Sequence, residues 1–405
     1  MKYPQGSIRR AMIGSPLNRR GPGCIFSVLM IILLGIALIG HLGIWVLEPP
    51  PAIGVFLMSF ALATVASLFV IWLLWVLDRH ERESIWFFVG AVLWGAVIST
   101  GLSGVFNNLG YGAITLGLEM VRGGVQNDML SELMTAAVIA PIVEEGAKGI
   151  AVLVLLFLLR AEFDNLRDGI IYGALVGVGF NIAEVALYVM KGYIDTGIAP
   201  FGEQFAARFV FLGFNGHMLW SALCGAGIGI ARQTANRALR WFAPIGGYLL
   251  AAFSHALWNS VGVFLIALIL VGMGHELGKE AIPPFSMWVA SSVTNLVVEG
   301  FAYLVLVFLL YLSAQWERAI IRTYLADEAG SHTVTTEEYA QIAIDRPFGR
   351  IMRHTHPDKG RNQAIINAQN ELAFRKWHLA RDAKNPDNDA LVAAWRDDIA
   401  KLRAS

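Results

Sequence analysis

The sequence predicts an all-α, polytopic membrane protein with about eight transmembrane helices and a small helical cytoplasmic tail. Hydrophobic residues make up 56% of the 405 residues and charged residues 15%, whereas a soluble globular chain carries about 25% charged residues. The apolar residues are gathered into stretches of about 20 residues, the length that an α-helix needs to cross a bilayer. Only after about residue 315 does the composition become polar, charged and helix-forming.

Eight segments satisfy the length criterion, and we expect each to form a transmembrane helix. They are residues 25–48, 52–77, 85–107, 131–160, 169–190, 206–231, 242–271 and 288–313. Gly, Ser and Thr dilute the third segment, and we expect Asn107-Asn108 to end it. The chain is therefore divided into a cytoplasmic basic N-terminus (1–24), a transmembrane domain (25–314) and a cytoplasmic helical tail (315–405).

The basic residues predict the orientation, because loops that face the cytoplasm carry the excess of Lys and Arg. With the N-terminus inside, the cytoplasmic side holds Lys2, Arg9, Arg10, Arg19, Arg20, Arg79, Arg82, Arg160, Arg167, Arg232, Arg237, Arg240, Arg318 and Arg322. The opposite loops hold Arg122, Lys191 and Lys279. We therefore expect a cell-membrane protein with both termini in the cytoplasm. The formal net charge of zero argues against nucleic acid as a partner.

The tail is predicted to contain three short amphipathic helices, at 337–344, 363–381 and 390–403. It also contains His356-Pro-Asp, the tripeptide of J-domain co-chaperones. The preceding Asp345-Arg-Pro-Phe-Gly breaks the helix that a J-domain requires there, so we interpret the match as chance.

Ionisable residues inside the spans predict a functional site. Glu144, Glu145 and Lys148 lie near the middle of the fourth span, where each charge costs about 2.5–3.5 kcal/mol on translocon scales. Glu144 and Lys148 are four residues apart, the spacing of a helical ion pair. We therefore expect Lys148 to neutralise Glu144 and to leave Glu145 as the more basic carboxylate.

The next three spans carry polar groups at similar depth. Glu184 lies in the fifth, His217 near the midpoint of the sixth, and His255 and Asn259 are one turn apart in the seventh. Each alone has a structural explanation, such as a satisfied core histidine or, for Ser221 after His217, helix packing. Four consecutive helices with such groups favour a site. Gly169, Gly173, Gly177 and Gly179 in the fifth span are expected to serve close helix packing instead.

The residue types suggest water activation. A desolvated carboxylate is suited to act as a general base for water, and a His or Asn259 can donate to a developing oxyanion. The same residues are also compatible with a hydrolytic zinc shell, made of His217, His255 and Glu184. Because the sequence has no His-Glu-x-x-His motif, spacing does not choose between the two chemistries.

Ordered pieces of the chain resemble the PrsW family of intramembrane proteases, which is related to the CAAX prenyl endopeptidase and bacteriocin-processing group. The pieces are Pro141–Lys148, Glu162–Gly173 and Gly177–Glu184, followed in the family's order by His217 and His255–Asn259. The resemblance covers roughly residues 130–260.

This resemblance implies an intramembrane endopeptidase that cleaves a membrane-anchored protein substrate, an anti-sigma factor or another regulator. Glu144 and Glu145 match the family's catalytic acidic pair, with Lys148 as their partner. The positions that match the other motif residues are Glu184, His217, His255 and Asn259. The family is classed both as metalloprotease and as glutamate-type protease, so zinc is implied only in the first case.

Two alternatives stay open. Val185 stands where the family pattern usually has Asn, which would fit a catalytically inactive homologue. Buried Glu, Lys and His also form proton relays, so the same residues are compatible with a proton-coupled transporter.

Overall fold

The computed structural model describes residues 15, 17, 20–78, 84–121, 128–160, 163–279, 281–344 and 353–404. Several residues of the sequence predictions lie outside this range: Lys2, Arg9, Arg10, Arg19, Arg79, Arg82, Arg122, Glu162 and Asp345–Gly349. The chain divides into a membrane unit, residues 14–77 and 85–306, and a tail unit, residues 1–13, 78–84 and 307–405. The sequence places the start of the tail at residue 315, whereas the two units separate between 306 and 307.

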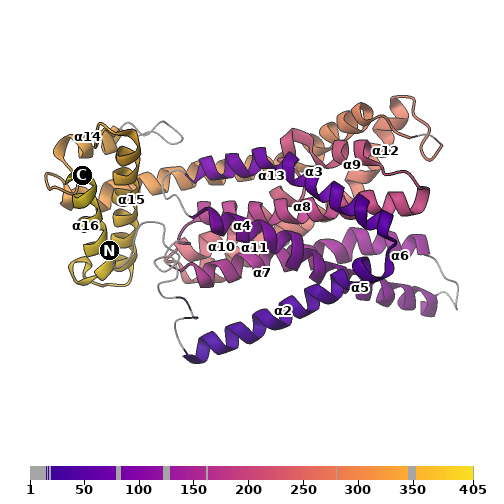
Figure 1. The fold of residues 1–405 in the computed structure, drawn as a ribbon, viewed down its shortest axis with the longest axis horizontal. Coiled ribbons are helices and arrows are strands. Elements are labelled where there is room, and N and C mark those ends of the chain that lie inside the picture. Colours follow the sequence, from indigo (N-terminus) through magenta and orange to yellow (C-terminus); the bar gives the residue numbers. More distant parts are fainter. Residues whose placement is uncertain are drawn as a thin grey trace. The chain divides into compact units, whose positions relative to one another are not determined.

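The described residues form helices and one isolated β-bridge, between Ala329 and Val334. In the membrane unit, the helical segments follow one another along the chain (Figure 1). They are α2 (Arg20–Leu47), α3 (Pro50–Leu77), α4–η2–α5 (Ile85–Leu93, Trp94–Ser99, Thr100–Val121), α6–η3–α7 (Asp128–Met134, Thr135–Ile139, Ala140–Leu158), α8 (Leu166–Thr196), α9–η4–α10 (Phe201–Arg208, Val210–Gly213, His217–Gln233), α11–η5–α12 (Arg237–Leu257, Trp258–Gly262, Val263–Gly272) and α13 (Pro284–Tyr324).

Six of the helices are long and apolar enough to cross a membrane, and the bent pair formed by α9 and η4–α10 would make a seventh. The segment α6–η3–α7 is not among them, and it carries Glu144, Glu145 and Lys148 within its apolar part. The prediction of an all-helical protein with several membrane spans is confirmed, whereas the count of eight stays a prediction.

The third span does not end at Asn107-Asn108, as the sequence predicts, because the helix continues to Val121. The Asn108 amide donates to the backbone oxygen of Gly104 at 2.8 Å, and the Asn107 amide donates to Glu144 at 3.1 Å. Both side chains find acceptors without leaving the helix, so neither has to break it.

The sixth span is not one continuous helix either. α9 and the η4–α10 segment meet at an angle of 67°, and the stretch that leads into α10 contains residues with positive φ. These are Phe211, Leu212, Gly213 and Gly216, with φ of 50°, 59°, 89° and 54°. His217, expected near the midpoint of a helix, is instead the first residue of α10.

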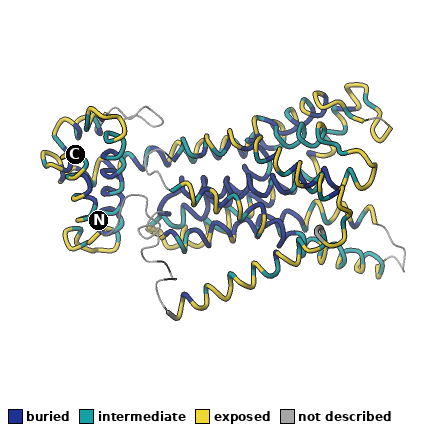
Figure 2. The backbone as a smooth tube through the Cα atoms, viewed as in Figure 1, coloured by how far each residue is buried: buried dark blue, intermediate teal, exposed yellow. Residues whose placement is uncertain are grey.

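Helix α8 is the centre of the membrane unit, and most of its residues are buried (Figure 2). It packs against α10 and also against α3, α4 and η2. A Cβ atom at Gly173 or Gly177 would lie 2.2 Å from a backbone oxygen of α10. The predicted role of these glycines in close helix packing is therefore confirmed. This packing places α10, and with it His217, directly against α8.

The tail unit contains the end of α13 and the helices α14 (Thr336–Ile344), α15 (Lys359–Arg381) and α16 (Ala390–Ala404), so the three predicted tail helices are confirmed. They share a buried apolar core that includes Leu325, Ile365, Phe374 and Trp395. The His356-Pro-Asp tripeptide begins α15: the Asp358 carboxylate accepts from the backbone N–H of Arg361 at 2.8 Å, as a helix N-cap does. The location of the tail in the cytoplasm stays a prediction.

Candidate active site

A buried polar cluster is built around the ammonium group of Lys148 on α7. Its Nζ lies 2.6 Å from Glu145 Oε1 and 2.8 Å from His217 Nδ1, but 3.9 Å from the nearest oxygen of Glu144. Lys148 and Glu145 have no exposed surface. The expected contact between Lys148 and Glu144 is therefore present at ion-pair distance, but Lys148 lies closer to Glu145, the reverse of the expected preference. Both carboxylates are one helical turn from Lys148, but Glu145 also contacts His255 on α11, while Lys148 also contacts His217 on α10.

Glu144 is held differently from Glu145. Its Oε1 accepts from the Asn107 amide at 3.1 Å, while its Oε2 is buried with no hydrogen-bond partner among the described residues. Glu144 is 6% exposed and, of the two glutamates, it is the one that lines the main cavity. A carboxylate oxygen that faces a cavity without a partner is free to accept a proton from a water molecule.

The hydrogen-bond partners of His217 determine its tautomer. An ammonium group can only donate, so His217 Nδ1 accepts from Lys148 and Nε2 carries the ring proton. Nε2 lies 2.7 Å from Glu184 Oε2, which also accepts from Arg208 Nη1 at 2.5 Å. Glu184 therefore orients His217 and is itself paired with Arg208.

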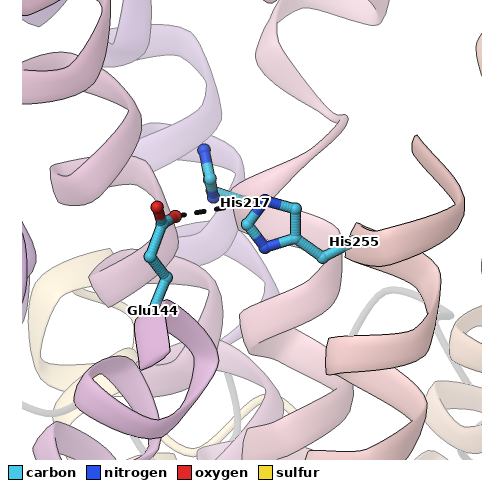
Figure 3. Close-up of side chains that lie close together, drawn as sticks. All are labelled: Glu144, His217 and His255. Atoms are coloured by element: carbon cyan, nitrogen blue, oxygen red, sulfur yellow. Dashed lines mark ion pairs between the residues drawn. The ribbon is translucent and has the colours of Figure 1, made fainter. Parts of the chain in front are cut away.

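His255 has the opposite arrangement. Its Nδ1 lies 3.1 Å from Glu145 Oε1, and an ionised carboxylate can only accept, so Nδ1 donates and Nε2 carries the lone pair. This nitrogen lies 4.0 Å from Glu144 Oε2, and the two side chains point toward one another (Figure 3). A water molecule that donates to both atoms, or a metal ion, is a group that both acceptors can bind at this distance.

The other predicted residues lie around this pair. Ser221 donates to Glu145 Oε2 at 3.4 Å, so it belongs to the cluster. Asn259 lines the cavity, but its amide donates to the backbone oxygen of Ala136 at 2.8 Å. Val185, at the departure from the family pattern, is fully buried, whereas Asn181 lines the cavity.

Three residues that the sequence prediction missed contact the cluster: Asn107, Arg208 and Trp220. Trp220 stacks on His255 with ring centroids 4.0 Å apart and an angle of 12°. It also donates its indole N–H to Glu299, a fourth missed residue, at 2.7 Å. Arg208 and Glu299 are ionisable residues inside the predicted spans 206–231 and 288–313. An ionisable residue inside an apolar span is the signal that identified Glu144, and it was present for Arg208 and Glu299 as well.

One group of metal-ligating side chains is found among the described residues: Glu144, His217 and His255 each offer a ligand atom, and these atoms lie within 4.8 Å of one another. Two imidazoles and a carboxylate are a donor set suited to zinc, and the unpartnered oxygen of Glu144 faces this group. The residues therefore fit a metal, with Glu144 in the place that the sequence prediction assigned to Glu184. Because both nitrogens of His217 already have partners, ligation by His217 requires it to exchange one of these contacts.

A cavity of about 880 Å³ opens onto the cluster. Its walls come from the middle of α5, the start of α6–η3–α7, the second half of α8, α9, the start of α10, the region where α11 passes into η5 and α12, and the start of α13. Among the lining residues, Glu132, Lys191, Glu203 and Met287 lie close in sequence to the connections 122–127, 197–200 and 273–283. A second cavity of about 260 Å³, between α5, α7 and α8, also reaches Glu144 and Glu184.

One comparison with known proteins finds a match for this chain. The sequence model described as PrsW family intramembrane metalloprotease matches residues 83–290, which are 208 of the 405 residues. No curated protein and no solved structure matches the chain.

Proposed function

Since the chain belongs to the PrsW family of intramembrane metalloproteases and is therefore a membrane protease, we propose that it cleaves a membrane-anchored protein substrate with Glu144 as the residue that activates water. The observation that carries this proposal is the 4.0 Å gap between Glu144 Oε2 and His255 Nε2 at the wall of the cavity. A water molecule between these two atoms would donate one hydrogen bond to each of them, and its oxygen would face the cavity.

The second carboxylate supports the first. Glu145 is ion-paired with Lys148 and accepts from His255 Nδ1, so its task is to keep the lone pair of His255 directed at Glu144. Lys148 and Glu184 fix His217 in the same way, one at each ring nitrogen. Asn259, at the wall of the same cavity, is the proposed amide donor to the oxyanion that develops on the substrate.

Metal dependence is part of this proposal. A zinc ion held by Glu144, His217 and His255 would polarise the scissile carbonyl and lower the pKa of a bound water. In either chemistry Glu144 contacts the reacting water or its activator, and the Glu145–Lys148 pair orients His255.

The side of the membrane follows from the cavity and the predicted orientation together. Residues that line the cavity lie close in sequence to connections that the basic residues assign to the outer side. We therefore propose that the scissile bond lies in the extracytoplasmic half of the bilayer. An anti-sigma factor or another membrane-anchored regulator is the proposed kind of substrate.

The experiment compares membrane proteomes of cells that produce the wild-type protein, the Glu144→Gln variant or the Glu276→Gln variant. Glu276 is a matched control because it lies in a surface connection with its side chain 66% exposed. Uncleaved membrane-anchored substrates should accumulate with Glu144→Gln alone. If no membrane protein changes its processing with Glu144→Gln, the proposed function is wrong.

The transporter alternative has less support. Discontinuous helices in two corresponding halves are typical of transporters, whereas the described residues contain one bent pair that passes the length and hydropathy criteria as a single span.

A further inference from the structure

Glu299 is a buried carboxyl group in the apolar helix α13 and has no part in the mechanism above. Its side chain has no exposed surface, and its Oε1 accepts the indole N–H of Trp220 at 2.7 Å. A buried carboxyl group in a membrane span is costly. The contact with Trp220 identifies what it does.

Trp220 is the aromatic wall of the site. Its ring stacks on His255, with centroids 4.0 Å apart and an angle of 12°, and lies edge-on to His217, with centroids 4.9 Å apart and an angle of 84°. The plane of the indole therefore determines the plane in which His255 can lie. That plane directs Nε2 of His255 at Glu144, 4.0 Å away.

We propose that Glu299 is a positioning residue for the hydrolytic site, which acts by holding the Trp220 indole in the plane that orients His255. A tryptophan side chain that packs only by its faces can rotate about χ2, whereas the hydrogen bond to Glu299 fixes one edge of the ring. The inference rests on the proposed function, because it assigns Glu299 to the same site.

Glu299 lies outside the part of the chain that the family model matches. The family match ends at residue 290, so Glu299 and most of α13 lie beyond it. One turn further along α13, Tyr303 donates to the backbone oxygen of Phe214 at 2.5 Å, in the positive-φ connection that precedes His217. The same helix therefore reaches the approach to both histidines, through Trp220 and through Phe214.

The test measures kcat and KM for cleavage of a membrane-anchored model substrate by the purified full-length protein. Glu299→Leu removes the acceptor, and Trp220→Phe removes the donor while it keeps an aromatic ring. Both should lower kcat by about ten- to hundredfold, the usual cost of losing a supporting hydrogen bond around an active site, and leave KM within about twofold. Glu299→Gln keeps an acceptor oxygen and should restore most of kcat.

The control is Asn295→Leu. Asn295 lies one turn before Glu299, is equally buried, and bonds within its own helix to Ser291. It should retain wild-type kcat. The double variant Trp220→Phe/Glu299→Leu should be no slower than the slower single variant, because both changes break the same contact.

A second measurement does not depend on cleavage. In protein labelled with 5-fluorotryptophan, the ¹⁹F resonance of Trp220, assigned through Trp220→Phe, should shift in Glu299→Leu and in His255→Ala but not in Asn295→Leu. If Glu299→Leu keeps wild-type kcat, or if the Trp220 resonance does not move, the positioning role is wrong. A failure of the proposed function would appear separately, as unchanged processing of membrane proteins in cells that produce Glu144→Gln.

Discussion

Lys148 and Glu145 form a fully buried ion pair, with Nζ 2.6 Å from Oε1. The pair separates the two adjacent glutamates into different roles, because Glu144 is left with a free oxygen at the cavity. Substitutions of the two residues should therefore have different consequences.

We predict that Glu145→Gln destabilises the protein, while Glu144→Gln mainly removes activity. Breaking a buried pair by removing one partner costs about 3–5 kcal/mol, since Lys148 would keep only the more distant Glu144, at 3.9 Å, as a counter-ion. Glu144→Gln keeps the hydrogen bond to Asn107 and should change stability by less than about 1 kcal/mol. Thermal unfolding in detergent, measured beside cleavage, checks both; equal loss of stability in the two variants would contradict the assignment.

The metal set gives a second prediction. If the purified protein carries zinc, Glu144→Ala, His217→Ala and His255→Ala should each lose it, while Glu184→Gln should keep most of it. The measurement is elemental analysis of the purified variants. The wild-type protein, treated with a chelator and then supplied with zinc, is analysed in parallel. Retention of zinc by Glu144→Ala together with its loss in Glu184→Gln would instead favour the ligand set predicted from sequence.

Close packing of α8 against α10 gives a third prediction. Gly177→Ala would place a Cβ atom 2.2 Å from the backbone oxygen of His217 and push the start of α10 away from α8. We expect a loss of stability of about 1–3 kcal/mol, as in other overpacked cores, and reduced cleavage because His217 moves. Gly90→Ala is the control, because nothing lies within 4 Å of a Cβ atom there. Similar melting temperatures for the two variants would show that α8 and α10 are not as close as described.

The tail unit gives a prediction about pH. Partial burial raises the pKa of Asp389, but hydrogen bonds from Arg375 and from the backbone N–H groups of Leu391 and Val392 outweigh it and lower the pKa below its ordinary range. This contribution to stability is therefore fully present above the unfolded pKa of about 4 and is lost as the pH falls through the lower folded pKa. The hydrogen-exchange protection of α15 and α16 in the full-length protein, relative to the intrinsic exchange rate at each pH, should fall at low pH, and Asp389→Asn should reduce that pH dependence. An unchanged pH profile in Asp389→Asn would exclude Asp389 as its source.

Much of the fold and most of the site follow from the sequence, because membrane insertion leaves strong local signals. Apolar stretches of bilayer length mark the helices, and an ionisable residue inside such a stretch is costly enough to indicate function. Glu144, Glu145, Glu184, His217 and His255 were identified in this way, and the structure brings all five together. The three tail helices were equally accessible from their periodicity.

The tertiary structure decided how these groups pair. Glu144 and Glu145 are both one turn from Lys148, so local spacing does not distinguish them. The contacts of His255 with Glu145 and of His217 with Lys148 do distinguish them, and these come from α11 and α10. The interruption before His217 contains four positive-φ residues, two of them not glycine, which the sequence analysis did not anticipate. The contact of Glu299 with Trp220, on which its proposed role rests, exists only because α13 packs beside α10 in the folded protein. The sequence by itself determined which ionisable residues lie inside apolar spans and therefore indicate a site, because the free-energy cost of such a residue depends only on the span that contains it. Which carboxylate is left free to act was decided by contacts between helices far apart in the chain.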